Sequence, residues 1–143
     1  MYVREGTAGD WGRLLEIWLE SVRTTHGFLS EADIAALMPE VRDLALPALE
    51  LWVLCDDVGE LLGFMGLDGA KVEALFIAPS SSRRGGGRML IEHARRLKGP
   101  LTVDVNEQNP AALQFYEAMG FRVCGRSAVD SAGRPFPLLH LGK

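Results

Sequence analysis

The sequence predicts one α/β domain in which helices cross over a mixed β-sheet. The chain has 143 residues, the size of one ordinary domain, and we expect a single domain over residues 1–143. Its composition is 48% hydrophobic and 24% charged, which is close to the globular average and unlike a disordered chain. Apolar residues recur with strand spacing and with helical spacing in turn, which predicts the order β-α-α-β-β-β-α-β-α-β-β.

The first half begins with a strand and two helices. Residues 1–5 are a short strand candidate, and Thr7 followed by Asp10 is a capping-box variant that opens a helix. Five apolar residues then give this helix one stripe at helical spacing: Leu14, Leu15, Trp18, Leu19 and Val22. Ser30 opens a second, shorter helix, which we expect Pro39 to break or bend.

Three strands follow in the middle of the chain. Residues 51–55 are apolar and predict a buried strand, and the turn-forming residues 56–59 lead into a return strand over 60–67. Residues 71–77 alternate and then become continuously apolar, which predicts a central strand that Pro79 stops.

The second half alternates helices and strands. The helix after the central strand has an expected inward face of Leu90, Ile91, Ala94 and Leu97. A strand over 101–105 precedes Asn109 and Pro110, which favour a helix start as N-cap and first helical residue. The apolar face of that helix is Ala112, Phe115, Tyr116 and Met119. Residues 121–126 and 137–141 predict a closing pair of strands.

Positive charge is concentrated in one segment of an otherwise acidic chain. The formal net charge is −4, but residues 83–98 hold six cations and a single acid, Glu92, so this segment is +5 and the remainder is −9. Proteins that coat nucleic acid or an anionic membrane normally carry net positive charge, so we expect neither partner. The segment instead predicts a local site for one anion, and the acidic remainder favours a cationic second substrate.

Two further absences narrow the expected class. Cys55 and Cys124 have no metal-ligand spacing around them, so we expect no metal site and two buried, reduced thiols. No apolar run approaches the roughly 18 residues that span a bilayer, and the N-terminus has no apolar core of a signal peptide. A cytoplasmic protein is therefore the expectation.

A glycine run between the central strand and the next helix is the strongest local signal. At Gly85–Gly87 the unpaired N–H groups of a helix start and the helix dipole favour an anion, and Arg83, Arg84 and Arg88 add charge. A phosphate-bearing ligand is one interpretation, and a flexible basic loop is the other. Two familiar phosphate motifs do not fit, because a Walker A loop needs lysine where Arg88 stands and a dinucleotide loop needs glycine where Leu90 stands.

Two long runs resemble the core of the GNAT N-acetyltransferase superfamily: LFIAPSSSRRGGGRML and VNEQNPAALQFYEAMGF. The tail GRSAVDSAGRPFPLLHL and the early SVRTTHGFL resemble one group of small bacterial members, so the similarity covers nearly the whole chain. The resemblance implies a strongly twisted mixed sheet of about six or seven strands flanked by about four helices. It also implies acetyl-CoA as co-substrate and no metal.

The resemblance assigns cofactor binding to three segments. Gly85 and Gly87 match the glycines of the loop that cradles the pyrophosphate, although Ser82 stands where the family has Arg or Gln. Amides of the central strand would pair with the pantetheine arm and polarise the thioester carbonyl, whereas read alone this run is simply core strand. The implied cofactor-binding residues are Leu75, Phe76, Ile77, Arg83, Arg84, Gly85, Gly86, Gly87, Arg88, Asn109, Phe115 and Tyr116.

The resemblance also suggests catalytic residues. Tyr116 alone would be a core aromatic, but in the family pattern its phenol lies near the sulfur and protonates the departing thiolate. Glu73 is a candidate general base that strand alternation would place on the same side as Leu75 and Ile77, or else a surface charge at the strand edge. His26, in the loop between the first two helices, would contact the acceptor or relay a proton, or be a surface histidine.

These observations together predict an acetyl-CoA-dependent N-acetyltransferase in which a primary amine attacks the thioester directly in a ternary complex. The alternative is a non-catalytic acyl-CoA-binding sensor or assembly module on the same fold, and a binder of another phosphate ligand is a third interpretation. The expected partners are acetyl-CoA and an amine acceptor that the sequence does not identify. The sequence is compatible with a homodimer.

Overall fold

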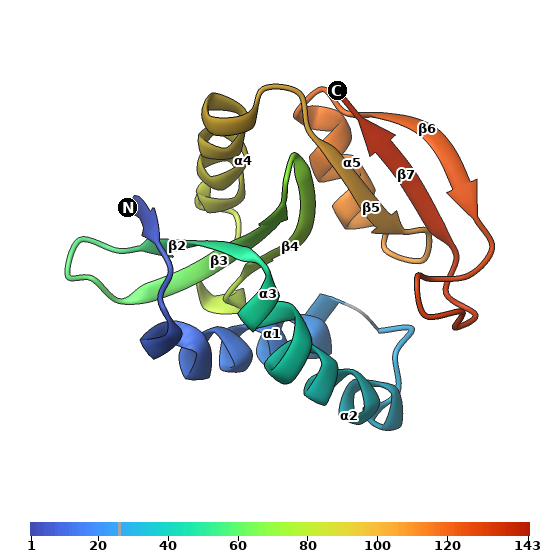
Figure 1. Cartoon of the computed structure of the whole chain (residues 1–143), viewed down its shortest axis with the longest axis horizontal. Helices are drawn as coiled ribbons and strands as arrows, with labels where there is room; N and C mark the ends of the chain where they lie inside the picture. Colours follow the sequence, from blue (N-terminus) through green and yellow to red (C-terminus); the bar gives the residue numbers. More distant parts are fainter. Residues whose placement is uncertain (26) are drawn as a thin grey trace.

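The computed structural model describes residues 1–25 and 27–143, and its described part contains one seven-stranded sheet (Figure 1). The strand order is β1-β2-β3-β4-β5-β7-β6, and every neighbouring pair is antiparallel except β4 with β5. The strands are β1 Tyr2–Glu5, β2 Glu50–Cys55, β3 Leu61–Asp68, β4 Lys71–Ile77, β5 Thr102–Asn106, β6 Arg122–Ser127 and β7 Leu138–Gly142.

Helices cover both faces of this sheet. The helices are α1 Trp11–Thr25, α2 Glu31–Glu40, α3 Leu46–Ala48, α4 Gly86–Lys98 and α5 Pro110–Ala118, with short segments η1 Ala8–Asp10, η2 Val41–Ala45 and η3 Pro79–Ser81. One apolar core lies between the sheet and α4 with α5, and a second lies between β2–β4 and the helices α1–α3. Because α2, η2 and α3 follow one another directly, the observed order confirms the predicted order and the mixed α/β fold.

Three expectations about single residues were wrong. Pro39 does not break its helix, because α2 passes through it and continues as the π-helical η2, where the N–H of Val41 bonds to the carbonyls of both Leu37 and Met38. Leu97 is 48% exposed because it lies beside the inward stripe of α4. Cys124 is also exposed, since it lies on the edge strand β6, whereas Cys55 is buried as expected.

The sheet splits between β4 and β5, and this split positions the site. Within the described residues these parallel strands pair only at Lys71 with Thr102 and at Val72 with Val103. Beyond that point β4 stays with β3, while β5 stays with β7 and β6. The two halves of the sheet therefore diverge and leave an open wedge, visible in Figure 1 between the green and the orange strands.

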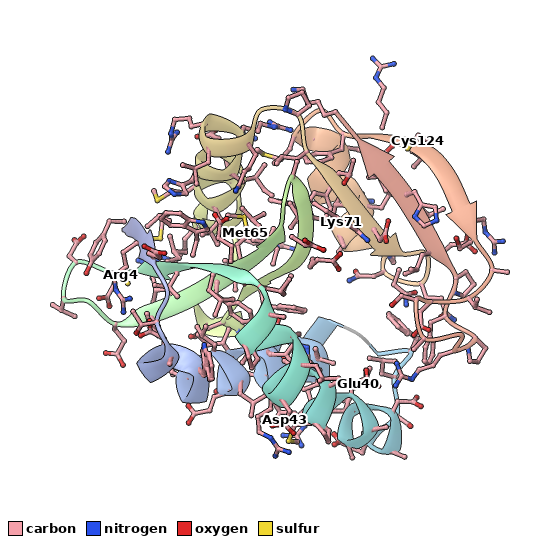
Figure 2. The ribbon with its side chains drawn as sticks, in the orientation of Figure 1. Arg4, Glu40, Asp43, Met65, Lys71 and Cys124 are labelled. Carbon is pink, nitrogen blue, oxygen red and sulfur yellow. The ribbon has the colours of Figure 1, made fainter. Side chains whose placement is uncertain are left out.

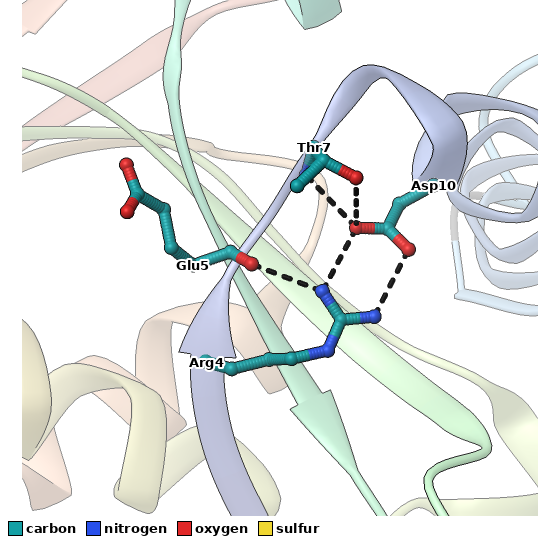
Figure 3. A network of polar contacts seen from close by, with 4 residues as sticks. All are labelled: Arg4, Glu5, Thr7 and Asp10. Atoms are coloured by element: carbon teal, nitrogen blue, oxygen red, sulfur yellow. Dashed lines mark hydrogen bonds and ion pairs between the residues drawn. The ribbon is translucent and has the colours of Figure 1, made fainter.

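The N-terminal strand is joined to α1 by a compact polar network (Figure 3). The guanidinium of Arg4 donates to both carboxylate oxygens of Asp10 at 3.0 Å, and the Asp10 carboxylate also accepts from the backbone N–H of Thr7 at 2.8 Å. One of the two hydrogen bonds of the predicted capping box is thus present, because the Asp10 side chain accepts from the backbone N–H of Thr7, the residue that precedes the helix. The hydrogen bond from Arg4, despite opposing burial, lowers the pKa of Asp10.

Asp10→Asn is expected to lower the free energy of unfolding by about 1 kcal/mol at pH 7, because the charged acceptor of Arg4 is lost from a partly exposed site. The pKa of Asp10 is lower in the folded protein, so its contribution is present above the unfolded-state pKa and is lost as pH falls through the folded-state pKa. The two proteins should therefore converge in acid. Urea titrations at pH 7 and pH 3 measure this, with Glu16→Gln in the exposed Arg13–Glu16 pair as control. An equal difference at both pH values would contradict the assignment.

Candidate active site

The edge of β4 that faces the wedge presents main-chain groups. Ala78 donates its N–H to Leu62 O at 2.7 Å, and the same register makes Phe76 with Phe64 the next hydrogen-bonded pair of β3 and β4. Because hydrogen-bonding direction alternates along an antiparallel strand, the N–H groups of Leu75 and Ile77 point away from β3. They point toward the gap that the divergence of β5 leaves open.

Side chains from β4, β5 and α5 line a hollow of about 130 Å³ in this gap. Adjoining depressions extend it along the end of β4 to the start of α4, so that one continuous groove results. The groove is lined by every predicted cofactor-binding residue except Arg84: Leu75, Phe76, Ile77, Arg83, Gly85, Gly86, Gly87, Arg88, Asn109, Phe115 and Tyr116. The structure therefore brings together residues that lie up to 41 positions apart in the sequence.

Two positions of the glycine loop favour glycine. Gly85 precedes α4 with φ +84°, a left-handed conformation that costs other residues free energy. Gly86, the first residue of α4, is buried, and a Cβ at this position would overlap the side chain of Leu54. The helix start can therefore lie close against β2, with its first N–H groups and Arg83 and Arg88 at the groove.

Asn109 and Phe115 form the opposite wall. The amide oxygen of Asn109 accepts from the N–H of Ala112 at 3.2 Å, which confirms the predicted N-cap of α5, and the residue also lines the hollow. The ring of Phe115 lies so close to Gly87 that a Cβ there would be 3.0 Å from Cζ. The groove is thus narrow and apolar between the glycine loop and the hollow.

Tyr116 lies at the inner end of the groove. Its ring packs edge-on against Phe115 and Phe121, with centroid distances of 5.0 and 5.3 Å. Its hydroxyl has no hydrogen-bond partner among the described residues, and burial raises its pKa well above the ordinary value. The phenol is therefore protonated at neutral pH and able to donate to a ligand in the hollow.

Glu73 lines the hollow together with Leu75, at an irregular point of β4. The register of β3 and β4 shifts between Gly66, which pairs with Ala74, and Leu67, which pairs with Val72, so Glu73 is an extra residue in a β-bulge. The bulge interrupts the simple alternation of β4 at this residue. Glu73 lines both the hollow and an apolar pocket on the α1 side of β4.

A polar row that sequence reasoning missed runs from Glu73 across β5, β7 and β6. Lys71 Nζ lies 3.1 Å from Glu73 Oε1 and 3.0 Å from Asp104 Oδ2, and Asp104 Oδ1 lies 2.6 Å from His140 Nδ1. The other imidazole nitrogen lies 2.7 Å from Ser127 Oγ. Lys71 and His140, the first and last of these residues in the sequence, are 69 positions apart. The strand order β4-β5-β7-β6 brings the residues together.

Charge pairing within this row outweighs burial. Burial by itself would raise the pKa of Asp104, but the hydrogen bonds from His140 and Lys71 hold that pKa below its ordinary value. Burial would likewise lower the pKa of Lys71, and the hydrogen bonds to Asp104 and Glu73 raise it instead. At neutral pH the row therefore contains a charged lysine between two carboxylates.

Two contacts join the far rim of the wedge. Arg134, in the loop before β7, bonds to Glu40 of α2 at 2.5 Å, and Phe136 lies 6.0 Å from Phe28 between ring centroids. Figure 2 shows Glu40 on the side of α2 that faces this loop. His26, the second candidate base, lies outside the described residues.

The described part of the chain contains neither a cluster of metal-ligating side chains nor a membrane-spanning helix. Among residues 1–25 and 27–143, no group of three or more His, Cys, Asp or Glu side chains is arranged to hold a metal ion. Within the same ranges no helix has the length and apolar character that crossing a membrane requires.

Comparison with known proteins identifies similar chains. Residues 47–123 match the acetyltransferase (GNAT) domain family. The peptidyl-lysine N-acetyltransferase YjaB of Salmonella typhimurium strain LT2 is 48% identical over 139 residues, covering 97% of this chain and 95% of that protein. The solution structure of apo-form YjaB from Escherichia coli is 42% identical with a TM-score of 0.91, covering 99% and 95% of the two chains.

A more distant structure shares the fold. The PaiA N-acetyltransferase from Thermoplasma acidophilum, solved in complex with coenzyme A, is 21% identical with a TM-score of 0.75. The match covers 97% of this chain and 96% of that one. The overall fold is therefore shared by chains whose sequences have diverged widely.

Proposed function

The chain belongs to the acetyltransferase (GNAT) family and is an N-acetyltransferase, and from this we propose that it transfers the acetyl group of acetyl-CoA to the ε-amino group of lysine side chains in proteins. The observation that carries the proposal is the continuous groove from the glycine loop to the hollow, whose two ends supply different chemistry. One end offers cations and helix N–H groups, and the other offers strand amides, a carboxylate and a phenol.

The groove residues have complementary parts in this reaction. Arg83, Arg88 and the start of α4 would hold the phosphates of acetyl-CoA. The N–H groups of Leu75 and Ile77 would stabilise the negative charge that develops on the thioester oxygen during attack. Tyr116 would protonate the departing sulfur, so that coenzyme A leaves as a thiol.

The acceptor amine must lose a proton before it attacks. Glu73 is the carboxylate that lies both in the hollow and in the apolar pocket on the α1 side of β4. That pocket has walls from Trp18, Leu46 and Phe76, which suit the four methylene groups of a lysine, with Glu73 at the end where the amine reacts. We therefore propose Glu73 as the base for a lysine acceptor.

A pair of peptides tests the acceptor class. The first has one lysine and an acetylated N-terminus, and the second has a free N-terminus and arginine in place of the lysine. We expect acetyl-CoA-dependent release of thiol with the first peptide and little with the second, and Glu73→Gln should lower kcat/KM for the first peptide. Transfer to the second peptide alone would contradict the lysine proposal.

The same assay separates the enzyme from the alternative function. Calorimetry measures acetyl-CoA binding independently of turnover. Binding without thiol release across a broad panel of amines would favour a non-catalytic acyl-CoA sensor. Absence of binding would reject both functions together.

A further inference from the structure

One lysine of the chain is paired with two carboxylates that line the candidate active site. Lys71 Nζ lies 3.1 Å from Glu73 Oε1 and 3.0 Å from Asp104 Oδ2, and both carboxylates line the hollow. Figure 2 shows Lys71 in the central space between the two halves of the sheet. An ε-ammonium group, the group that the proposed acceptor would bring, therefore lies at the edge of the reaction site.

The strand register shows how near this group is to the reacting position. Lys71 pairs with Thr102 at the apex of the wedge, so Asp104 is level with the second residue after Lys71. Because Nζ contacts both Glu73 and Asp104, it reaches past its own backbone position toward the open part of the wedge. Ala74 and Leu75, the next residues of β4, line the same hollow.

We infer that Lys71 is an internal acceptor, which the protein acetylates within the same molecule when acetyl-CoA is bound. This inference rests on the proposed lysine acetyltransferase function. Nζ would form a bond to the acetyl carbonyl carbon while the bond from that carbon to sulfur breaks. Of the two protons that the nitrogen loses, Glu73 takes one and releases it to solvent, and the other replaces the proton that Tyr116 gives to sulfur.

The surroundings of Lys71 set the direction of the pH dependence. Glu73 of β4 and Asp104 of β5 face the ammonium group directly, and His140 of β7 faces it through Asp104. These contacts keep Lys71 protonated at neutral pH, and only the neutral amine attacks. Acetylation of Lys71 should therefore become faster as pH rises.

The sequence offers a sharp experiment because it has only three lysines: Lys71, Lys98 and Lys143. Lys98 is a matched control, since its Nζ is also paired with a carboxylate, at 2.9 Å from Glu50 Oε1, but Glu50 does not line the groove. The wild-type chain is incubated with acetyl-CoA and no other acceptor, and acetylation at each lysine is followed by mass spectrometry. We expect acetylation of Lys71 to be at least about tenfold faster than that of Lys98.

Three further measurements test whether acetylation of Lys71 is enzymatic, intramolecular and specific to this position. Tyr116→Phe should slow acetylation of Lys71 by the factor by which it slows transfer to the lysine peptide, while Lys98 and Lys143 are unaffected. The first-order rate constant should not depend on protein concentration. Lys71→Arg should abolish the modification at this position and leave the other two lysines unchanged.

The outcomes that would overturn the inference differ from those that would overturn the function. Equal rates at the three lysines, or a Tyr116→Phe variant that slows transfer to the peptide but not to Lys71, would mean chemical acetylation by the thioester. A rate constant proportional to protein concentration would mean transfer between molecules. If the lysine peptide is acetylated while Lys71 is not, the inference fails and the proposed function stands; if acetyl-CoA binds and neither is acetylated, the proposed function itself fails.

Discussion

Tyr116→Phe is expected to lower kcat with a lysine peptide about a hundredfold while the Kd for acetyl-CoA changes less than about twofold. The change removes one oxygen from a ring that otherwise keeps its contacts with Phe115 and Phe121. General acid catalysis typically contributes about 10²–10⁴ to a rate. The charged contacts that we propose for the cofactor lie at the other end of the groove, so its affinity should be preserved.

Steady-state kinetics and calorimetry together measure this prediction. Stability serves as the control, because the hydroxyl has no partner among the described residues and its removal should leave the urea midpoint nearly unchanged. An acceptor with a reactive, neutral amine tests the role further, since thiolate departure is still required. Unchanged turnover with such an acceptor would remove Tyr116 from the mechanism.

Replacing both Arg83 and Arg88 by Gln should raise the Kd for acetyl-CoA at least about a hundredfold. Both residues line the groove at the start of α4, and hydrogen bonds to charged groups are each worth about 1.5–3 kcal/mol. Arg84→Gln is the matched control, because Arg84 has the same charge and lies between them in sequence but does not line the groove. It should change the Kd by less than about twofold.

Calorimetry at two salt concentrations distinguishes local contacts from a general effect of charge. A pair of direct phosphate contacts predicts that the double variant also weakens the salt dependence of binding. If Arg84→Gln and each single variant weaken binding equally, the loop acts only through its total charge, and the assignment of Arg83 and Arg88 is wrong.

The local patterns of this sequence predicted its elements well because each had a clear physical origin. The Asn109–Pro110 start of α5 and the strand over Lys71–Ile77 match the structure, since capping and apolar spacing act over a few residues. Most residues that line the groove were cofactor-binding candidates in the sequence, because glycine and arginine positions follow the motifs of the family. Arg84 does not line the groove, since motif spacing does not reveal which of two adjacent side chains faces it.

The features that local patterns did not predict depend on tertiary structure. The bulge at Glu73 arises from the register between β3 and β4, and no period within β4 itself indicates it. The row from Glu73 to Ser127 depends on the crossed order β5-β7-β6, so its members have no common sequence motif. Pro39 lies within α2, which continues into η2, and helix propensity alone does not predict this continuation.

Within the described residues, the short pairing of β4 with β5 divides the sheet into two plates that share only a short stretch of backbone pairing. A ligand that lies along the free edge of β4, in the place of a neighbouring strand, would form contacts with both plates. Its binding free energy would then stabilise the contact between the plates as well as the complex, because a ligand that binds only the folded state adds to its stability. In this protein the co-substrate would be a structural element of the sheet for as long as it is bound, and each turnover would end with the release of that element.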